Sequence, residues 1–341
     1  MNNVDKQYLD LLQDILDNGV YKETRSGAVR SVFGRMMRFN LQDGLPILTT
    51  KKVFTKGIIH ELLWFLKADT NIKYLIDNNV HIWDDDAYRY YKEICKKYNE
   101  KEIPKDKQAF LAYVKLSLTH EFNSFFYCYG DIGNVYGHQW RNWRGVDQIG
   151  NLIKTLKENP NDRRLIVSAW NVDEIPSMGL PPCHYAFQCY ATPLNNMERL
   201  DWLCDHSNGE YDEWKTATSE QLDGLNVPKY GLNLMWMQRS VDSCIGLPFN
   251  ITSYSILLSM IAQCVHMIPN ELICSLGDTH IYENHIEGLK EQLTRNPYKY
   301  KLPKLWLNSE ITDIDNFKFE DIKITGYESY PSIKYPLSVG S

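Results

Sequence analysis

The 341-residue sequence lacks the patterns that mark several large classes of protein. Its longest mostly apolar stretch, residues 251–268, is interrupted by Ser, Thr, Gln and His, which a bilayer core would penalise. Lys and Arg number 37 against 43 Asp and Glu, so no broad basic surface for coating nucleic acid is expected. No internal repeat or low-complexity tract occurs. We therefore expect a globular protein that requires neither membrane nor nucleic acid.

Cofactor and metal motifs are also missing. Neither G-x-G-x-x-G nor G-x-x-x-x-G-K-[ST] occurs, so side chains must bind any nucleotide phosphate. His60 and Glu61 resemble the start of H-E-x-x-H, but position 64 is Trp and the second zinc ligand is absent. The acidic run Asp84 to Asp86 is typical of a solvated turn or a helix cap. The eight cysteines include no C-x-x-C pair and follow no signal-peptide pattern, which predicts a reduced, cytoplasmic chain without bound metal.

Hydrophobic periodicity predicts a mixture of helices and strands. Helices are expected over 4–17, 56–66 and 251–266, and strands over 32–41, 165–170, 186–191, 232–237 and 323–327. The stretch 89–128 has weak helical periodicity and is interpreted as an insertion. The polar stretch 193–230 is a second insertion or a long excursion between two strands. The pattern favours one α/β (α+β) domain over residues 1–341 with these insertions.

One cysteine stands in an unusual setting. Cys183 follows two prolines in the segment LPPCH and precedes an expected strand, so its sulfur is presented in one place. A buried structural cysteine is the commoner interpretation of such a residue. Cations that favour a thiolate are available at Arg163, Arg164 and Arg239, each next to an expected strand. A cysteine hydrolase is disfavoured, because adjacent side chains on an extended strand point to opposite faces.

Ordered blocks along nearly the whole chain carry a family resemblance. The chain resembles the folate-dependent thymidylate synthases in TRSGAVRSVFG, PILTTKKV, IIHELLWFLKADTNIKYL, VHIWD, GDIGNVYGHQWRNW, NPNDRRLIVSAWN, GLPPCHYAFQCY, QRSVDSCIGLPFNITSY, LGDTHIYENH and GYESYPSIKYP. The resemblance implies a mixed twisted sheet packed by helices, with the sheets of two subunits back to back in a homodimer. It also implies a methyltransferase of nucleotide biosynthesis that converts dUMP to dTMP with 5,10-methylenetetrahydrofolate and releases dihydrofolate.

The resemblance implies roles for the residues at matching positions. Cys183 would add to C6 of the uracil ring of dUMP, and Asn250 would pair with the O4 and N3–H edge, as a carboxamide can. Glu61, inside an apolar helix, would have a raised pKa and organise water for proton transfer. Tyr136 would assist removal of the C5 proton, and His184 would support the site. The implied catalytic residues are Cys183, Glu61, Tyr136, Asn250, His184 and Asp242.

The resemblance also divides the ligand contacts between two subunits. Arg25 and Arg239 of one subunit, with Arg163 and Arg164 of the other, would hold the dUMP phosphate through their guanidinium groups. The further dUMP-binding residues would be Gln238, Ser240, Asn250, His280 and Tyr282. The folate would contact Lys51, towards its glutamate tail, and Ile82, Trp83, Asp242, Gly246 and Phe249. No metal is implied, and the net charge of −6 is compatible with a local arginine cluster.

Three features depart from the family's usual pattern. The loop RSGAVR that begins at Arg25 has one glycine fewer than usual, Asp86 stands where many relatives have Trp or Asn near the pterin, and the chain ends KYPLSVGS. The altered C-terminal tail, Asp86 and the two insertions leave open a dUMP 5-hydroxymethyltransferase, in which water instead of hydride quenches the methylene intermediate. A catalytically idle nucleotide-binding protein is a further alternative. The joint presence of Cys183, Glu61, Tyr136 and Asn250 argues against it.

Overall fold

The computed structural model describes residues 3–98, 104–116, 129–207, 209–211 and 214–336. Its α-helices are α1 (Asn3–Asn18), α2 (Thr55–Leu66), α3 (Lys73–Asp77), α4 (Asp84–Tyr98), α5 (Lys107–Leu116), α6 (Tyr136–Asn142), α7 (Gln148–Glu158), α8 (Asn196–His206), α9 (Ser219–Gly224), α10 (Gly246–Cys264) and α11 (Ile286–Leu293). Its strands are β1 (Val20–Thr24), β2 (Gly27–Asn40), β3 (Ile166–Ser168), β4 (His184–Pro193), β5 (Tyr230–Asp242), β6 (Ile268–Tyr282), β7 (Lys304–Leu307) and β8 (Ile322–Thr325).

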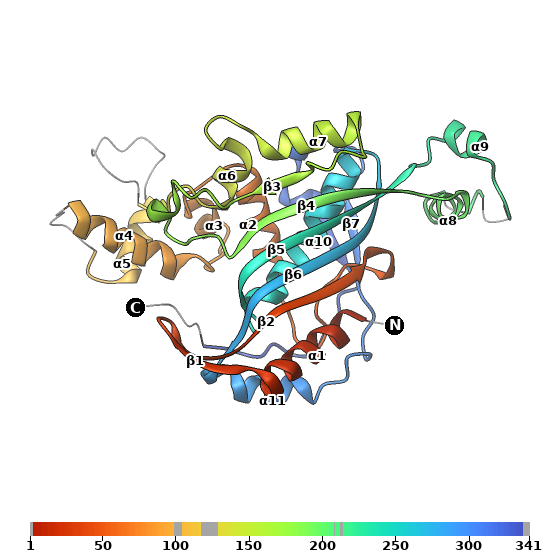
Figure 1. Cartoon of the computed structure of the whole chain (residues 1–341). Coiled ribbons are helices and arrows are strands. Elements are labelled where there is room, and N and C mark those ends of the chain that lie inside the picture. The colour runs from red at the N-terminus through yellow and green to blue at the C-terminus, as the bar shows by residue number, and fades with distance from the viewer. Residues whose placement is uncertain (1–2, 99–103, 117–128, 208, 212–213, 337–341) are drawn as a thin grey trace.

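A six-stranded sheet in the order β1-β2-β6-β5-β4-β3 forms the centre of the molecule (Figure 1). Neighbouring strands run antiparallel except β5 and β6, which are parallel. A parallel pair needs a crossover connection, and α10 supplies it while packing against both strands. Because α10 is enclosed, nearly all of its residues are buried, which explains its apolar composition. The predicted class, a mixed sheet packed by helices, is confirmed.

Only one face of the sheet is covered by the chain's own core. Met37 of β2 and Phe187 of β4 point into that core, as the two-residue repeat of a strand allows. Their neighbours on the opposite face are exposed: Phe33 is 81% exposed, Tyr190 67% and Met36 58%. The opposite face therefore presents large apolar side chains to solvent in a single chain. We call these three residues, Phe33, Met36 and Tyr190, the open sheet face.

The described part of the first insertion is more helical than its sequence predicts. The helix α4 begins at Asp84 and α5 at Lys107, and aromatic rings make much of the contact between them, with Val114 of α5 also fully buried. Phe110 of α5 is fully buried, and its ring centroid lies 5.4 Å from that of Tyr88 and 5.2 Å from that of Tyr91. The run Asp84 to Asp86 forms the first turn of α4, where carboxylates interact favourably with the helix dipole.

The second insertion is an arm, residues 194–229, that joins β4 to β5. The arm projects from the sheet at the end opposite α4 and α5 (Figure 1). Its helices α8 and α9 each begin with a capping box, at Asn195 and Thr218. Its apolar residues form a cluster separate from the main core, made of Leu200, Leu203, Leu222 and Val227. The arm is therefore a small structural unit with its own core.

Candidate active site

Two elements, α6 and β5, and two preceding prolines fix the backbone of Cys183, which directly precedes β4. Its N–H donates to Tyr136 Oη at 2.8 Å, from the first residue of α6. Its carbonyl accepts from the Arg239 N–H of β5, also at 2.8 Å. The two prolines before it restrict the approach of the chain. The Cys183 backbone is thus held in one place between α6 and β5.

The Arg239 side chain folds back onto the same segment. Its Nε donates to the Pro182 carbonyl and a terminal nitrogen to the Pro181 carbonyl, each at 2.9 Å. The guanidinium also lies over the Trp170 ring, 5.3 Å from the centroid. These contacts hold a cation beside Cys183.

Burial nevertheless controls the Cys183 thiol in the free protein. Burial raises the thiol pKa above its ordinary value, Arg239 opposes the rise, and Asp86 adds to it. The sequence-based expectation that Arg239 favours the thiolate is correct in sign, but this effect is smaller than that of burial. Anything that brings further positive charge to the site would therefore activate the sulfur.

His184, next to Cys183 in the chain, packs against the aromatic rings of Tyr136 and Tyr254. Its ring stacks on Tyr136 with centroids 4.1 Å apart, and its Nδ1 lies 2.8 Å from Tyr254 Oη. Burial lowers the pKa of His184 to about 3, so the ring is neutral at physiological pH. Its contacts are those of a supporting residue and not of an acid–base pair with Cys183. Tyr254 was missed in the sequence, because a tyrosine within a buried helix has no local signal of such a partner.

Glu61 is a carboxylic acid in an apolar setting. Trp83 Nε1 donates to Glu61 Oε1 at 2.7 Å. Burial raises the pKa of Glu61 to about 7, and the hydrogen bond from Trp83 opposes the rise. The Trp83 ring centroid lies 6.2 Å from that of Tyr136. Trp83 therefore lies between Glu61 and Tyr136, the residue that contacts Cys183. The raised pKa predicted for a Glu in this helix is found, and the group can hold or release a proton near neutral pH.

A hydrogen-bonded chain orients the Asn250 amide. Gln238 Nε2 donates to Asn250 Oδ1 at 3.2 Å and to the Ser240 carbonyl at 3.1 Å. Gln238 Oε1 accepts from Trp236 Nε1 at 3.1 Å, which sets the direction of its own amide. Gln238 is also the register partner of His184 across β4 and β5. Asn250 and Gln238 therefore lie at the same end of the sheet as Cys183.

The neighbouring strand β6 contributes His280 and Tyr282. His280 is the register partner of Asp242, and its ring contacts that of Tyr282 edge-on at 5.3 Å. Asp242 Oδ1 accepts from two backbone N–H groups, at 2.9 and 3.0 Å, just before α10 begins. Burial raises the pKa of Tyr282, and the charges of Asp242, Cys183 and Arg25 also act on it. Tyr282 is thus within electrostatic reach of both Cys183 and Arg25.

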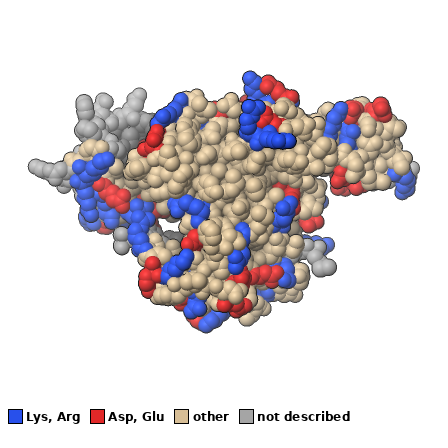
Figure 2. Space-filling view, viewed as in Figure 1, with Lys and Arg blue, Asp and Glu red and all other residues tan. Residues whose placement is uncertain are grey.

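The residues expected to contact folate differ in accessibility. Ile82 is 37% exposed and Phe249 is partly buried against the core. A Cβ added at Gly246 would be in ordinary van der Waals contact with Asp242 and Asn250, at 3.7 and 3.9 Å. In the space-filling view, the surface is hollowed between the α4–α5 region and the end of the sheet (Figure 2).

Lys51 is deeply buried. Its Nζ donates to the Cys244 carbonyl and lies over the Tyr335 ring, 4.6 Å from the centroid. Burial lowers the pKa of Lys51 to about 8. This position is unlike that of a side chain facing an extended anionic tail.

Three of the predicted phosphate-binding arginines, Arg25, Arg163 and Arg164, do not contact Cys183 within the same chain. Arg25 is exposed in the turn between β1 and β2. Arg164 is 89% exposed and pairs with Asp162. The Arg163 carbonyl accepts from Gln188, five residues along the strand from Cys183, or about 17 Å at the rise of a β-strand. The chain's own Arg163 and Arg164 therefore lie far from its own Cys183.

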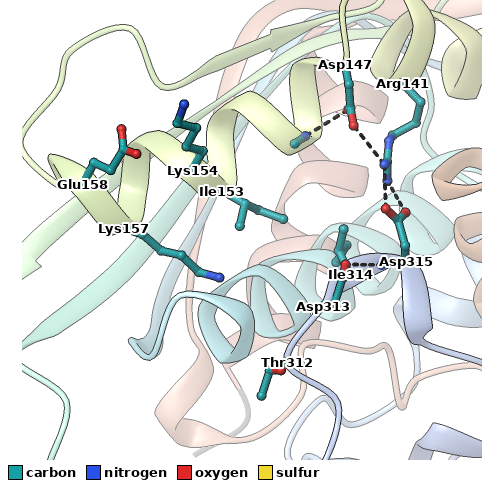
Figure 3. A pocket seen from close by; sticks show the side chains of 11 residues that line it. Arg141, Asp147, Ile153, Lys154, Lys157, Glu158, Thr312, Asp313, Ile314 and Asp315 are labelled. Atoms are coloured by element: carbon teal, nitrogen blue, oxygen red, sulfur yellow. Dashed lines mark hydrogen bonds and ion pairs between the residues drawn. The ribbon is translucent and has the colours of Figure 1, made fainter.

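A cavity of about 500 Å³ lies elsewhere, between α7 and residues 312–315 (Figure 3). At its rim, Arg141 pairs with Asp147 at 2.9 Å and with Asp315 at 2.7 Å. None of the residues predicted for the active site lines this cavity. Across the residues described, no group of three His, Cys, Asp or Glu side chains is arranged to hold a metal ion. No helix in the same residues is long and apolar enough to cross a bilayer.

Known proteins resemble this chain along its whole length. A sequence profile described as thymidylate synthase matches residues 6–339. A thymidylate synthase of Mycoplasma mobile is 44% identical over 336 residues, which cover 98% of this chain and all of the relative. Those of Malacoplasma penetrans and Phytoplasma mali are 43% and 42% identical, over 98% and 97% of this chain and over 100% and 99% of their own lengths.

Proposed function

The chain belongs to the thymidylate synthase family and is a methyltransferase, and on this premise we propose that it converts dUMP to dTMP with 5,10-methylenetetrahydrofolate, releasing dihydrofolate. One observation carries the proposal. Cys183 is fixed by Tyr136 and Arg239 at the end of the sheet where Gln238 orients Asn250. A nucleophile, a cation and a uracil-matching amide thus occur at one place.

In the proposed reaction, Cys183 Sγ attacks C6 of the uracil ring. The S–C6 bond forms, the C5=C6 π bond breaks, and its electron pair moves toward the C4 carbonyl oxygen. C5 becomes nucleophilic, and the later loss of sulfur restores Cys183. The Asn250 amide matches the O4 and N3–H edge with one donor and one acceptor. The cation of Arg239 beside the sulfur favours the thiolate that attacks.

Glu61 is proposed to relay protons at the uracil O4 and the folate nitrogens. Its pKa of about 7 lets it exist in both protonation states near neutral pH, as an efficient acid–base catalyst requires. Tyr136 Oη, which accepts the Cys183 N–H, is proposed to assist removal of the C5 proton. Asp242, His280 and Tyr282 line the β5–β6 side, where the sugar is proposed to lie.

The folate is proposed to lie over Ile82, Trp83, Gly246 and Phe249. When bound, it supplies the one-carbon unit and the hydride. The exposed side chain of Ile82 and the absence of a side chain at Gly246 suit a flat ring system. Trp83 also contacts Glu61, so a ligand on this surface lies next to the proposed proton relay.

The phosphate site is proposed to be shared in a homodimer. Arg25 and Arg239 come from one subunit, with Arg163 and Arg164 of the partner subunit. The distance between Cys183 and the chain's own Arg163 supports sharing, since one chain cannot use both in one site. The open sheet face, Phe33, Met36 and Tyr190, supports back-to-back pairing, because apolar side chains on this scale mark protein interfaces.

Product analysis tests the proposal. Purified protein is incubated with dUMP and 5,10-methylenetetrahydrofolate. The nucleotide product is identified by its mass in mass spectrometry, and dihydrofolate formation is followed by near-ultraviolet absorbance. We expect a methylated nucleotide and an equal amount of dihydrofolate, and none of either with Cys183→Ser. A hydroxymethyl product without dihydrofolate would instead assign the 5-hydroxymethyltransferase reaction. A Cys183→Ser variant with undiminished turnover would contradict the covalent mechanism.

A further inference from the structure

The first two turns of α4 are hydrogen-bonded to residues 177–179, the segment that leads to Cys183. A terminal nitrogen of Arg89 donates both to Asp86 Oδ1 at 2.9 Å and to the Gly179 carbonyl at 2.7 Å. The adjacent Tyr90 Oη donates to the Ser177 carbonyl at 2.7 Å. Arg89 is only 15% exposed, so both of its bonds are sheltered from water.

The hydrogen-bonded segment has no room to shift. Gly179 N–H donates to the Ile132 carbonyl at 2.8 Å. A Cβ added at Gly179 would lie 3.0 Å from that carbonyl oxygen and 3.1 Å from the Tyr90 ring. From Gly179 the chain reaches Cys183 through Leu180 and two prolines, which leave little slack. A displacement of Arg89 would therefore be transmitted to the sulfur.

The carboxylate of Asp86 also acts on Cys183 through its negative charge. Its side chain is 24% exposed, and its charge acts on the Cys183 thiol in the direction opposite to Arg239. The other titratable groups that face the thiol are Arg239 and Asp242 of β5, Tyr136 of α6 and Tyr282 of β6. Arg89 pairs with Asp86 at 2.9 Å, so its cation offsets part of the negative charge that acts on the nucleophile.

We propose that Asp86 and Arg89 are positioning residues for the nucleophile: Asp86 holds Arg89, Arg89 fixes the Gly179 carbonyl and hence Cys183, and the charge of Asp86 adds to the burial that keeps the thiol weakly reactive in the free protein. The proposal rests on the proposed role of Cys183 in the reaction. It assigns α4, where the first insertion begins, a part in setting the reactivity of the site.

Alkylation of Cys183 at a series of pH values tests the charge effect in the full chain, without substrate. Iodoacetamide is the probe, and mass spectrometry of the Cys183 peptide gives the rate. Asp86→Asn removes the negative charge, so we expect the alkylation midpoint to fall and the rate at pH 7 to rise about two- to fourfold, since a more acidic thiolate is also a weaker nucleophile. Arg89→Gln leaves Asp86 uncompensated and should move the midpoint upward.

Two further variants separate charge, position and folding. Glu93→Gln is the matched control, because Glu93 also pairs with Arg89, at 3.2 Å, but is 59% exposed and is not among the charges acting on Cys183. It should leave the midpoint unchanged. Arg89→Lys keeps the positive charge but loses the planar guanidinium group that binds both Asp86 and the Gly179 carbonyl. We expect an unchanged midpoint but roughly tenfold lower kcat for dUMP, with little change in KM.

The outcomes discriminate clearly. Shifts in the same direction for Asp86→Asn and Arg89→Gln, or no shift with Asp86→Asn, would overturn the electrostatic part. An Arg89→Lys variant with wild-type kcat would overturn the positioning part. If Arg89→Gln does not fold, Asp86→Asn and Arg89→Lys still decide both parts. Alkylation needs no turnover, so failure of the proposed reaction would be seen separately, in the product assay.

Discussion

Burial moves four site residues toward their neutral forms. The pKa of Glu61 rises to about 7 and that of Cys183 also rises, whereas the pKa of His184 falls to about 3 and that of Lys51 to about 8. In each case desolvation disfavours the charged form more than neighbouring charges support it. A site of this kind is poised to respond to an anionic ligand and its bound arginines, because added charges act strongly in a dry environment.

Glu61→Gln should reveal the cost of burying this acid. The pKa of Glu61 rises from an ordinary 4.5 to about 7, so folding favours the protonated form. Its contribution to stability is therefore fully present below pH 4.5 and is lost as the pH rises through 7. The shift corresponds to at most about 3 kcal/mol. Glutamine resembles the protonated acid and can keep the bond from Trp83, so we expect the variant to be the more stable protein at pH 8 and nearly equal at pH 4.5.

Urea unfolding at the two pH values measures this difference. The same variant should lose most of its turnover, since an amide cannot relay a proton. A stability difference that is the same at both pH values would show that Glu61 is not titrating in the folded protein.

At the scale of elements, a buried carboxylate ties the first helix to the segment before α2. Asp5 of α1 accepts hydrogen bonds from the backbone N–H groups of Thr49 and Thr50, at 2.9 Å each, and from both threonine hydroxyls. Asp5 is fully buried, and Lys51 follows directly. This contact therefore sets where residues 49–51 enter the site.

Asp5→Ala should be severely destabilising. The two backbone N–H groups would be left buried without their partner, at a cost of about 3–5 kcal/mol in free energy of unfolding. Asp10→Ala is the control on the same helix, because Asp10 is 59% exposed and pairs with Lys6 at i,i+4 on the surface. That change should cost less than about 0.5 kcal/mol. Equal losses for the two variants in urea unfolding would show that Asp5 contributes no more than a surface charge.

The arm, residues 194–229, should be dispensable for the fold. Pro193 and Tyr230 are register partners, and the Leu194 N–H donates to the Lys229 carbonyl at 3.0 Å. A two-residue Asn-Gly turn in place of residues 195–228 therefore closes the β4–β5 hairpin in register. Because the arm has its own apolar cluster, the main core loses little. We expect an unfolding temperature within about 4 °C of the wild type and unchanged alkylation of Cys183.

A single substitution checks one long-range hydrogen bond between the arm and the rest of the chain. His266 Nε2 lies 2.8 Å from the Asn226 carbonyl, at the base of the arm. His266→Ala in the full chain should reproduce any small loss seen in the deletion. A cooperative collapse of the shortened chain would mean that the arm stabilises the sheet.

Elements could be predicted from the sequence where burial leaves a regular pattern. The amphipathic α1 and the apolar α2 and α10 were expected nearly in full, and the strands expected over 186–191 and 232–237 are the centres of β4 and β5. β1 was not expected, because all five of its residues are exposed and none alternates. The helix α4 was not expected, because tyrosines form much of its apolar face.

The candidate site was more predictable from family motifs than from local chemistry. Cys183 and Glu61 stand out, since prolines precede one and an apolar helix surrounds the other. Arg89 and Tyr254 carry no such signal. Their partners, Gly179 and His184, lie 90 and 70 residues away in the chain, and only the fold brings them together.

At the scale of the whole molecule, Cys183 and the arginines proposed to complete its site lie at different positions along β4. Cys183 directly precedes this strand, whereas the Arg163 carbonyl accepts from Gln188 in the middle of the strand. A two-fold axis that pairs the open sheet faces can bring Arg163 and Arg164 of one chain to the cysteine of the other. The proposed dimer with two shared sites would then explain both the apolar face and the separation of the two parts of the site.

Subunits that each lack one half of the site test this arrangement. A Cys183→Ser chain keeps its arginines, and an Arg163→Ala/Arg164→Ala chain keeps its cysteine. We expect each alone to turn over dUMP roughly a hundredfold more slowly or worse. After the two are unfolded and refolded together, about a quarter of wild-type activity should return, since half of randomly formed dimers are mixed and each has one intact site of two. Differently tagged chains verify the mixed dimers, and mixed dimers that stay inactive would mean that the arginines do not cross between subunits.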